Sequence, residues 1–148
     1  MQKIITNKKA TFNYELLDTY EAGVVLSGYE VKALRVGKAQ LDGAYVILRD
    51  GEAFLKNAHI SAFQEANTPA TYLPNRERKL LLSKKELSRF ARELNTAGLT
   101  LVPLKWYNKN GKIKLAIALA RGKKKVDKRE TLKQRAVKRD IDRTLKNQ

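Results

Sequence analysis

Cysteine is absent from this 148-residue chain, and histidine and tryptophan each occur only once. The lack of thiols excludes a disulfide framework and thiolate catalysis. A metal site needs several histidine, cysteine or carboxylate ligands at suitable spacing, and the sequence shows no such cluster. It also lacks a glycine-rich phosphate loop. We therefore expect no metal, no cofactor and no enzymatic activity.

Long apolar runs are missing as well. The first nine residues, MQKIITNKK, contain none long enough for a signal peptide or a membrane span. The basic C-terminal part has only a thin apolar stripe, without tryptophan or phenylalanine to anchor it on a membrane surface. The sequence thus predicts a cytoplasmic protein without a membrane partner.

What the chain has in excess is positive charge. It carries 31 Lys and Arg against 15 Asp and Glu, a net charge of +16. Residues 121–148 hold twelve of these basic residues and four of the acidic ones, with no aromatic residue and no proline. Such a segment cannot build a core of its own but can become helical on a polyanion. The charge indicates a nucleic acid partner.

One folded domain followed by an extension fits the composition, because 43% of the residues are hydrophobic. We predict an RNA-binding body at residues 1–121 and a basic tail at residues 122–148. In the tail Leu132, Ile141 and Leu145 lie on a stripe too narrow for a stable isolated helix. We expect the tail to be disordered alone and helical when bound. A permanently disordered, solubilising tail is the alternative.

Short strand patterns dominate the body. The hairpin signal Asp50-Gly51 separates two of them, and apolar residues alternate strictly from Ile113 to Leu119. Residues 67–78 contain two prolines and little periodicity, which is typical of a surface loop. Strands are predicted at residues 11–17, 22–26, 44–49, 52–57, 58–63, 99–107 and 112–120.

Capping boxes, in which a Ser oxygen and a Glu carboxylate satisfy free amides at a helix start, predict two helices. The first box is Ser27-Gly28-Tyr29-Glu30, and its helix covers residues 29–36 and stops at Gly37. The second box is Ser83-Lys84-Lys85-Glu86, and its helix ends at Gly98. The second helix has the spacing of one buried face at Leu87, Phe90, Ala91 and Leu94.

These elements define a mainly β fold class with inserted helices. A small antiparallel barrel closes a sheet of short, hairpin-linked strands and removes its exposed edges. We predict an OB-like antiparallel β-barrel, and a β-sandwich is the alternative that the pattern leaves open.

Two kinds of side chain have both a functional and a structural interpretation. His59 lies in a strand-like stretch with apolar neighbours, which favours a structural or surface role over catalysis. Trp106 and Tyr107 precede a loop with Lys109 and Lys112, so they could stack on unpaired bases. For Trp106 we favour packing in the core.

Basic residues beside apolar ones are the candidate phosphate contacts. Lys32 and Arg35 would project from one side of the first helix, and Lys38 follows it. A solvated outer face is the alternative for these three. Five more cations surround the leucines at residues 80–82: Arg76, Arg78, Lys79, Lys84 and Lys85. For these we favour phosphate contact, and a solvated loop followed by a core strand is the alternative.

Nine strings of the sequence carry a further signal. They are NKKA at 7–10, YEAG at 20–23, GYEVKALR at 28–35, GKA at 37–39, DGE at 50–52, RKLLL at 78–82, GLTLVPL at 98–104, ARGKK at 120–124 and DKR at 127–129. In content and order they resemble the SmpB family, also called SsrA-binding proteins. The resemblance covers essentially the whole chain.

This resemblance implies an OB-like barrel, accompanying helices and a C-terminal extension. It implies binding to the tRNA-like domain of transfer-messenger RNA (tmRNA) and delivery of that RNA to stalled 70S ribosomes, with elongation factor EF-Tu in the delivery complex. It also implies that the tail occupies the empty mRNA channel near the decoding centre. A ribosomal or ribosome-assembly protein that binds rRNA is the alternative, which composition alone does not exclude.

The resemblance assigns Asn7, Glu21 and Leu81 to the tRNA-like domain, where the Glu21 carboxylate would accept hydrogen bonds from base amino or imino groups. The ribosome-binding residues of the tail would be Gly122, Lys123, Lys124, Asp127, Lys128 and Arg129. Together with the basic clusters, the candidate RNA-binding residues of the body are Asn7, Lys8, Lys9, Glu21, Lys32, Arg35, Lys38, Arg78, Lys79, Leu81 and Lys84.

The chain departs from the family pattern in two places. Thr11 and Phe12 follow the first string, where the family usually has an Arg-His pair. Val126 precedes the DKR string, where many members have a histidine or an aromatic residue. Val126 has no ring to stack on a ribosomal base and offers only apolar contact.

Overall fold

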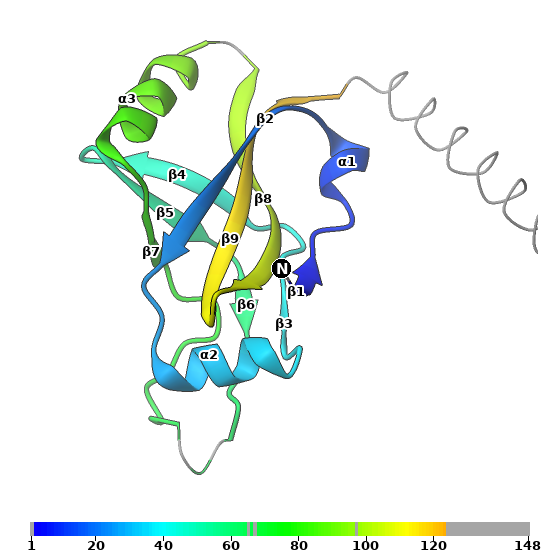
Figure 1. Ribbon diagram of the computed structural model, residues 1–148, viewed down its shortest axis with the longest axis vertical. Coiled ribbons are helices and arrows are strands. Elements are labelled where there is room, and N and C mark those ends of the chain that lie inside the picture. The colour runs from blue at the N-terminus through cyan, green and yellow to red at the C-terminus, as the bar shows by residue number, and fades with distance from the viewer. Residues whose placement is uncertain (1, 65, 67, 97, 124–148) are drawn as a thin grey trace, which may run out of the picture.

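The computed structural model describes residues 2–64, 66, 68–96 and 98–123, with side chains from residue 5 onward (Figure 1). The predictions for Lys124, Val126, Asp127, Lys128, Arg129 and the tail helix lie outside these residues. The elements in chain order are β1 (Gln2–Thr6), α1 (Ala10–Asn13), β2 (Tyr14–Val24), α2 (Gly28–Arg35), β3 (Ala39–Gln40), β4 (Tyr45–Arg49), β5 (Glu52–Lys56), β6 (His59–Ile60), β7 (Arg78–Leu81), α3 (Lys84–Glu93), β8 (Leu99–Lys109) and β9 (Lys112–Gly122).

The main sheet closes on itself. Its strands are hydrogen-bonded in the order β1-β8-β4-β5-β7-β2-β9, and β8 also pairs with β9. Six strands from β8 round to β9 therefore form a ring of antiparallel pairs, with β1 attached to β8. Figure 1 shows α2 and α3 at opposite ends of this sheet and α1 beside the point where β9 ends. The prediction of a mainly β fold is confirmed, and the ring is that of a barrel rather than a sandwich.

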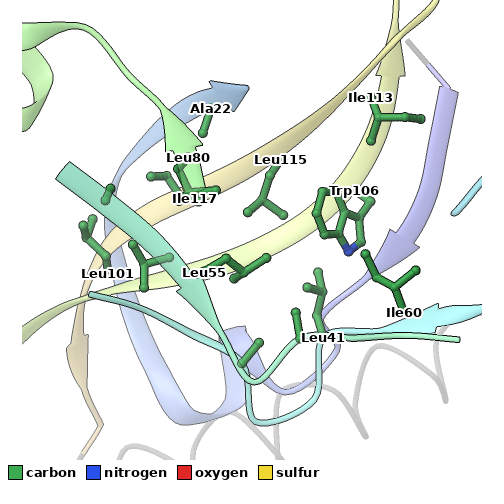
Figure 2. Packing of buried hydrophobic residues seen from close by; sticks show 14 of the residues in the cluster. Ala22, Leu41, Leu55, Ile60, Leu80, Leu101, Trp106, Ile113, Leu115 and Ile117 are labelled. Atoms are coloured by element: carbon green, nitrogen blue, oxygen red, sulfur yellow. The ribbon is translucent and has the colours of Figure 1, made fainter. Parts of the chain in front are cut away.

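The interior of the barrel is filled by large apolar side chains. Trp106 on β8 is fully buried and lies near Ile60 and Ile113 (Figure 2). Removing a Leu or Ile side chain from water in this way stabilises the fold by about 1.5–3 kcal/mol. Trp106 therefore packs in the core, as favoured from the sequence, and is not available to stack on a base.

Local signals account for the turns and helix ends. Asp50 and Gly51 have φ angles of 53° and 75°, as required by the two-residue turn predicted between β4 and β5. Asn110 and Gly111 make the same kind of turn between β8 and β9, with φ angles of 51° and 78°. Gly37, at φ 79°, follows the end of α2.

The N-terminal third differs from the expectation. Residues 11–13 of the first predicted strand belong to α1 (Ala10–Asn13) instead. Residues 14–17 are extended as predicted, but they are part of one long strand, β2, which covers Tyr14–Val24 with a shift in register between Leu16 and Asp18. It stays extended because β9 supplies partners along its length, from Gly122 opposite Tyr14 to Lys114 opposite Gly23. β1 was not predicted at all.

Smaller differences concern two other segments, residues 58–63 and helix α3. The strand expected at residues 58–63 is only His59–Ile60. Helix α3 ends at Glu93, several residues before Gly98. Phe90 on α3 is buried, and Leu87 and the capping residue Leu94 are partly buried, but Ala91 is exposed. The buried face of α3 is therefore narrower than predicted.

Candidate RNA-binding surface

Four neighbouring strands place a row of residues on the outside of the barrel. Leu81 on β7 is opposite Gly23 on β2, Gly23 is opposite Lys114 on β9, and Lys114 is opposite Tyr107 on β8. Glu21 lies two residues before Gly23 on the same face of β2, because side chains of a strand alternate between its faces. The structure therefore brings Glu21 and Leu81, two residues predicted to bind RNA, onto one surface, which we call the β2 face.

A groove crosses this face beside Leu81. The Leu81 side chain is 54% exposed and lies across Gly23, where an added Cβ would come within 3.2 Å of the Leu81 Cβ atom. Arg35 reaches the groove from α2, and its guanidinium donates a hydrogen bond to the carbonyl of Gly111 at 2.9 Å. The groove has a volume of about 380 Å³ and is lined by Gly23, Val24, Leu26, Val31, Arg35, Leu81, Gly111, Lys112, Ile113 and Lys114. It combines an apolar wall with cations, a combination that suits an unpaired nucleotide.

Glu21 is an exposed carboxylate held by two donors. The Tyr107 hydroxyl donates to its Oε2 atom at 2.6 Å, and the Lys109 ammonium donates to the same oxygen at 3.0 Å. The hydrogen bond from Tyr107, followed by that from Lys109, lowers the pKa of Glu21 below its usual value of 4.5. The carboxylate is therefore ionised at neutral pH and presents an acceptor among basic side chains.

Asn7 lines a different cavity. Its backbone amide donates to Leu104 O at 2.7 Å and its side-chain amide to Pro103 O at 2.9 Å. Among the described residues, no donor contacts its buried Oδ1 atom. Lys8 and Lys9 are exposed on the adjacent turn. The cavity, of about 360 Å³, is lined by Asn7, Lys9, Ala10, Asn13, Tyr14, Gly43, Ala44, Tyr45 and Val102.

The predicted cations of α2 and of the segment after it are exposed. Lys32 lines a cavity of about 270 Å³ together with Tyr29 and Phe63. Lys38 lies with its Nζ atom 5.9 Å from the centre of the Phe63 ring. Lys32 and Lys38 therefore lie beside Phe63, whereas Arg35, the third of these predicted cations, lines the groove.

Two further candidate cations, Lys79 and Lys84, lie on β7 and α3, and Lys85 beside Lys84 is exposed as well. Lys79 makes an ion pair with Glu52 at 2.9 Å on the outside of the barrel. Lys84 is exposed at the start of α3. Both remain accessible to an RNA backbone.

The prediction for Arg78 is wrong, because its side chain is completely buried. β7 turns Arg78 and Leu80 inward while Lys79 and Leu81 face outward. Inside, Arg78 forms an ion pair with Glu30 at 2.6 Å and donates to Ala58 O at 2.7 Å. A charge with these partners stabilises the interior and does not reach RNA.

Glu30 does more than cap α2. Its carboxylate accepts a hydrogen bond from the Ser27 backbone amide, as predicted for the capping box. It also accepts hydrogen bonds from Arg76, Arg78 and Tyr72. Burial raises the pKa of Glu30, but the hydrogen bonds and charges of Arg76, Ser27 and Arg78 outweigh it and hold the pKa at about 2. The loop before β7 is thereby fastened to the helix.

The tail begins against α1. Gly122, the predicted departure point of the tail, is the last residue of β9 and lies opposite Tyr14 of β2. The Lys123 amide donates to Asn13 O at 2.9 Å, and its ammonium donates to Thr11 O at 2.8 Å. The second contact uses the main chain of Thr11, so it does not depend on the side chain at which the sequence departs from the family.

His59 has a structural environment. Its Nδ1 atom lies 2.8 Å from Asn75 Oδ1 and its Nε2 atom 3.1 Å from Ser61 Oγ, so both ring nitrogens are engaged. Among the described residues, no group of three histidine or acidic side chains could hold a metal ion. A search of the same residues finds no helix that is long and apolar enough to cross a membrane.

Sequence reasoning missed part of the β2 face. Lys114 belongs to the row with Leu81, and Tyr107 contacts Glu21. The sequence did not predict that either residue forms a site with Glu21. Strict alternation from Ile113 to Leu119 is the signal that could have placed Lys114 on the outer face of β9. The pairing of Tyr107 with Glu21 depends on strand register, which the sequence does not reveal.

Comparison with known proteins agrees with this architecture. The family model described as SmpB protein matches residues 4–147. The SsrA-binding protein of Trichormus variabilis is 49% identical over 146 residues, which cover 98% of this chain and 94% of that protein. The SsrA-binding protein of Enterococcus hirae is 50% identical over 144 residues, which cover 97% and 93%.

A solved structure is also similar. It is described as "tmRNA-SmpB: a journey to the center of the bacterial ribosome", and it matches with a TM-score of 0.68 and 44% sequence identity. The match covers 83% of this chain and 86% of that one. The barrel, the β2 face and similarity over nearly the full length lead to one conclusion: this chain belongs to the SmpB family.

Proposed function

We propose that this chain is an adaptor of trans-translation that binds the tRNA-like domain of tmRNA through its barrel. The observation that carries the proposal is the similarity to SsrA-binding proteins over nearly the whole chain. The β2 face supports it, because it presents cations, an apolar side chain and a carboxylate on one surface.

These groups would divide the work of recognition. Arg35, Lys112 and Lys114 would neutralise phosphates, which supplies affinity that falls as salt rises. Leu81 offers an apolar surface to an unpaired base, and Glu21 accepts hydrogen bonds from base edges. Asn7, Lys8 and Lys9 would extend the contact on the cavity beside α1. The role is one of binding, not of catalysis.

In this proposal the tail acts on the ribosome. Residues 122–148 would occupy the empty mRNA channel near the decoding centre of a stalled 70S ribosome, with EF-Tu in the delivery complex in the cytoplasm. The tail's contacts would come from Gly122, Lys123, Lys124, Asp127, Lys128 and Arg129. The strongly basic composition of residues 121–148 supports binding to rRNA.

A binding measurement tests the body. Fluorescence anisotropy with a transcript of the tRNA-like domain should give nanomolar affinity at physiological salt, and the affinity should fall steeply as salt is raised. A hairpin of equal length and unrelated sequence is the control. Equal affinity for both RNAs would overturn the proposal. It would leave a general rRNA-binding ribosomal or assembly protein, which co-purifies in constant proportion with all ribosomes.

Truncation tests the tail. Deleting residues 124–148 keeps Lys123 and its contacts with α1, so we expect binding of the tRNA-like domain to persist and tagging of stalled products to be lost. A tail of the same composition in shuffled order is the matched control, because it keeps the charge. Tagging by the truncated protein in a reconstituted translation assay would contradict the division between body and tail.

A further inference from the structure

The carboxylate of Glu21 is held through only one of its oxygens. Tyr107 and Lys109 both donate to Oε2, and among the described residues no donor contacts Oε1. The Glu21 side chain is 37% exposed. A carboxylate oxygen can accept two hydrogen bonds, so Oε1 keeps its full acceptor capacity.

Tyr107 and Lys109 contribute differently to this arrangement. Tyr107 is 5% exposed, so its ring is fixed within the sheet and its hydroxyl has few positions. Burial, and then the hydrogen bond to Glu21, raise the pKa of Tyr107, which keeps its hydroxyl a donor at neutral pH. The Lys109 side chain is 43% exposed on a flexible stem and mainly supplies charge. Orientation therefore comes from Tyr107.

A base is a more suitable RNA partner for Glu21 than a phosphate is. A carboxylate repels phosphate oxygens but accepts N–H donors from base edges. Gly23, two residues further on β2, is covered by the Leu81 side chain, so the face that carries the Glu21 carboxylate also offers an apolar surface to a base.

We propose that Tyr107 is a positioning residue for RNA recognition: it holds Glu21 through Oε2 so that Oε1 accepts an N–H donor from an unpaired base of the bound RNA. This inference rests on the proposed function. It assigns selectivity for a base to a pair of residues, Glu21 and Tyr107, of which only Glu21 touches the RNA.

The substitution Tyr107→Phe tests the proposal because it keeps the ring and removes only the hydroxyl. We expect affinity for a transcript of the tRNA-like domain to fall about tenfold, the loss typical of one hydrogen bond to a charged group. The melting temperature should move by no more than a few degrees. Tyr20→Phe is the matched control: Tyr20 precedes Glu21 on β2, and its buried hydroxyl has no partner among the described residues. It should leave RNA affinity unchanged.

A double-mutant cycle shows whether Tyr107 acts through Glu21. Glu21→Gln should weaken binding about tenfold or more, and the double variant with Tyr107→Phe should bind no more weakly than Glu21→Gln alone. Additive losses would overturn the proposal. If Tyr107→Phe does not fold, Glu21→Asp tests the same contact from the other side, because the shorter side chain keeps the charge but withdraws the carboxylate from the Tyr107 hydroxyl. RNA affinity should then fall about tenfold, and unchanged affinity would overturn the proposal.

A titration separates positioning from a merely structural hydroxyl. The carboxyl carbon of Glu21 can be followed by NMR as pH is lowered, with Lys109 and Lys114 as the remaining charges that act on it. In Tyr107→Phe the pKa of Glu21 should rise toward 4.5, because the contact that lowers it most is gone. An unchanged pKa contradicts the inference. If the wild-type protein does not bind the RNA, the proposed function fails; if it binds and Tyr107→Phe binds equally well, only this inference fails.

Discussion

Two glutamates of this protein have similar partners but differ in burial. Glu30 is fully buried, and both of its oxygens accept hydrogen bonds, from Ser27 and Arg76 on one and from Tyr72, Arg76 and Arg78 on the other. Glu21 is exposed and engages a tyrosine and a lysine through a single oxygen. A carboxylate with no acceptor capacity left can only hold the fold together, whereas one with a spare oxygen can also recognise a ligand.

The largest expected effect separates the two glutamates by stability. Glu30→Ala leaves two arginines without their buried carboxylate, which should cost about 3–5 kcal/mol of unfolding free energy. Glu21→Ala should cost much less, because the carboxylate and its partner Lys109 are exposed to solvent. Urea denaturation measures both. Similar losses of unfolding free energy in the two variants would contradict the view that Glu30 is structural and Glu21 is free to bind a ligand.

Acid should act on the buried site. The pKa of Glu30 falls from 4.5 to about 2 on folding, so this group contributes stability that is fully present above pH 4.5 and lost as pH falls toward 2. The contribution is about 3 kcal/mol at neutral pH. Urea midpoints measured between pH 6 and 2 should fall less in Glu30→Gln than in the wild type. Parallel pH profiles would contradict this assignment.

Leu81 is a second exposed residue of the β2 face that we expect to contact RNA rather than to stabilise the fold. Leu81→Ser removes an apolar side chain that is 54% exposed, so we expect little change in melting temperature. Affinity for the tRNA-like domain should fall about tenfold, since loss of one stacking or apolar contact with a base costs about 1–3 kcal/mol. Anisotropy measures the loss, and Leu73→Ser, at another exposed leucine, is the control. Equal losses in the two variants would deny Leu81 a specific contact.

The smallest effect concerns the ion pair of Lys79 with Glu52, which lies on the surface. Lys79→Met should change the unfolding free energy by less than about 1 kcal/mol, because exposed pairs contribute little. Its RNA affinity should fall uniformly across RNA sequences, with a shallower salt dependence, if the ammonium contacts phosphate. An unaltered salt slope would place Lys79 outside the RNA contact.

Local chemistry explains which parts of the fold were predictable. Asp50-Gly51 and the two Ser-x-x-Glu boxes act through neighbouring residues, so the first hairpin and both main helices could be read from the sequence. β1 and the full length of β2 could not, because they depend on partners in β8 and β9 that are distant in the chain.

The same distinction holds for the site. Glu21 and Leu81 were identified from family resemblance, and only the strand register shows that they share a face with Lys114 and Tyr107. Arg78 was wrongly predicted to be exposed. An arginine beside leucines usually lies at the surface, unless a buried carboxylate pairs with it. That carboxylate, Glu30, had already been explained by the capping box.

The closure of the ring has a consequence for biosynthesis. β2 spans Tyr14–Val24, yet its main partner β9 starts only at Lys112. During translation a nascent chain must therefore carry an unpaired β2 edge until nearly the whole body has been made. Contacts of such high sequence separation slow folding and leave the edge open to mispairing. The ring of strands can therefore close only once β9 has been synthesised.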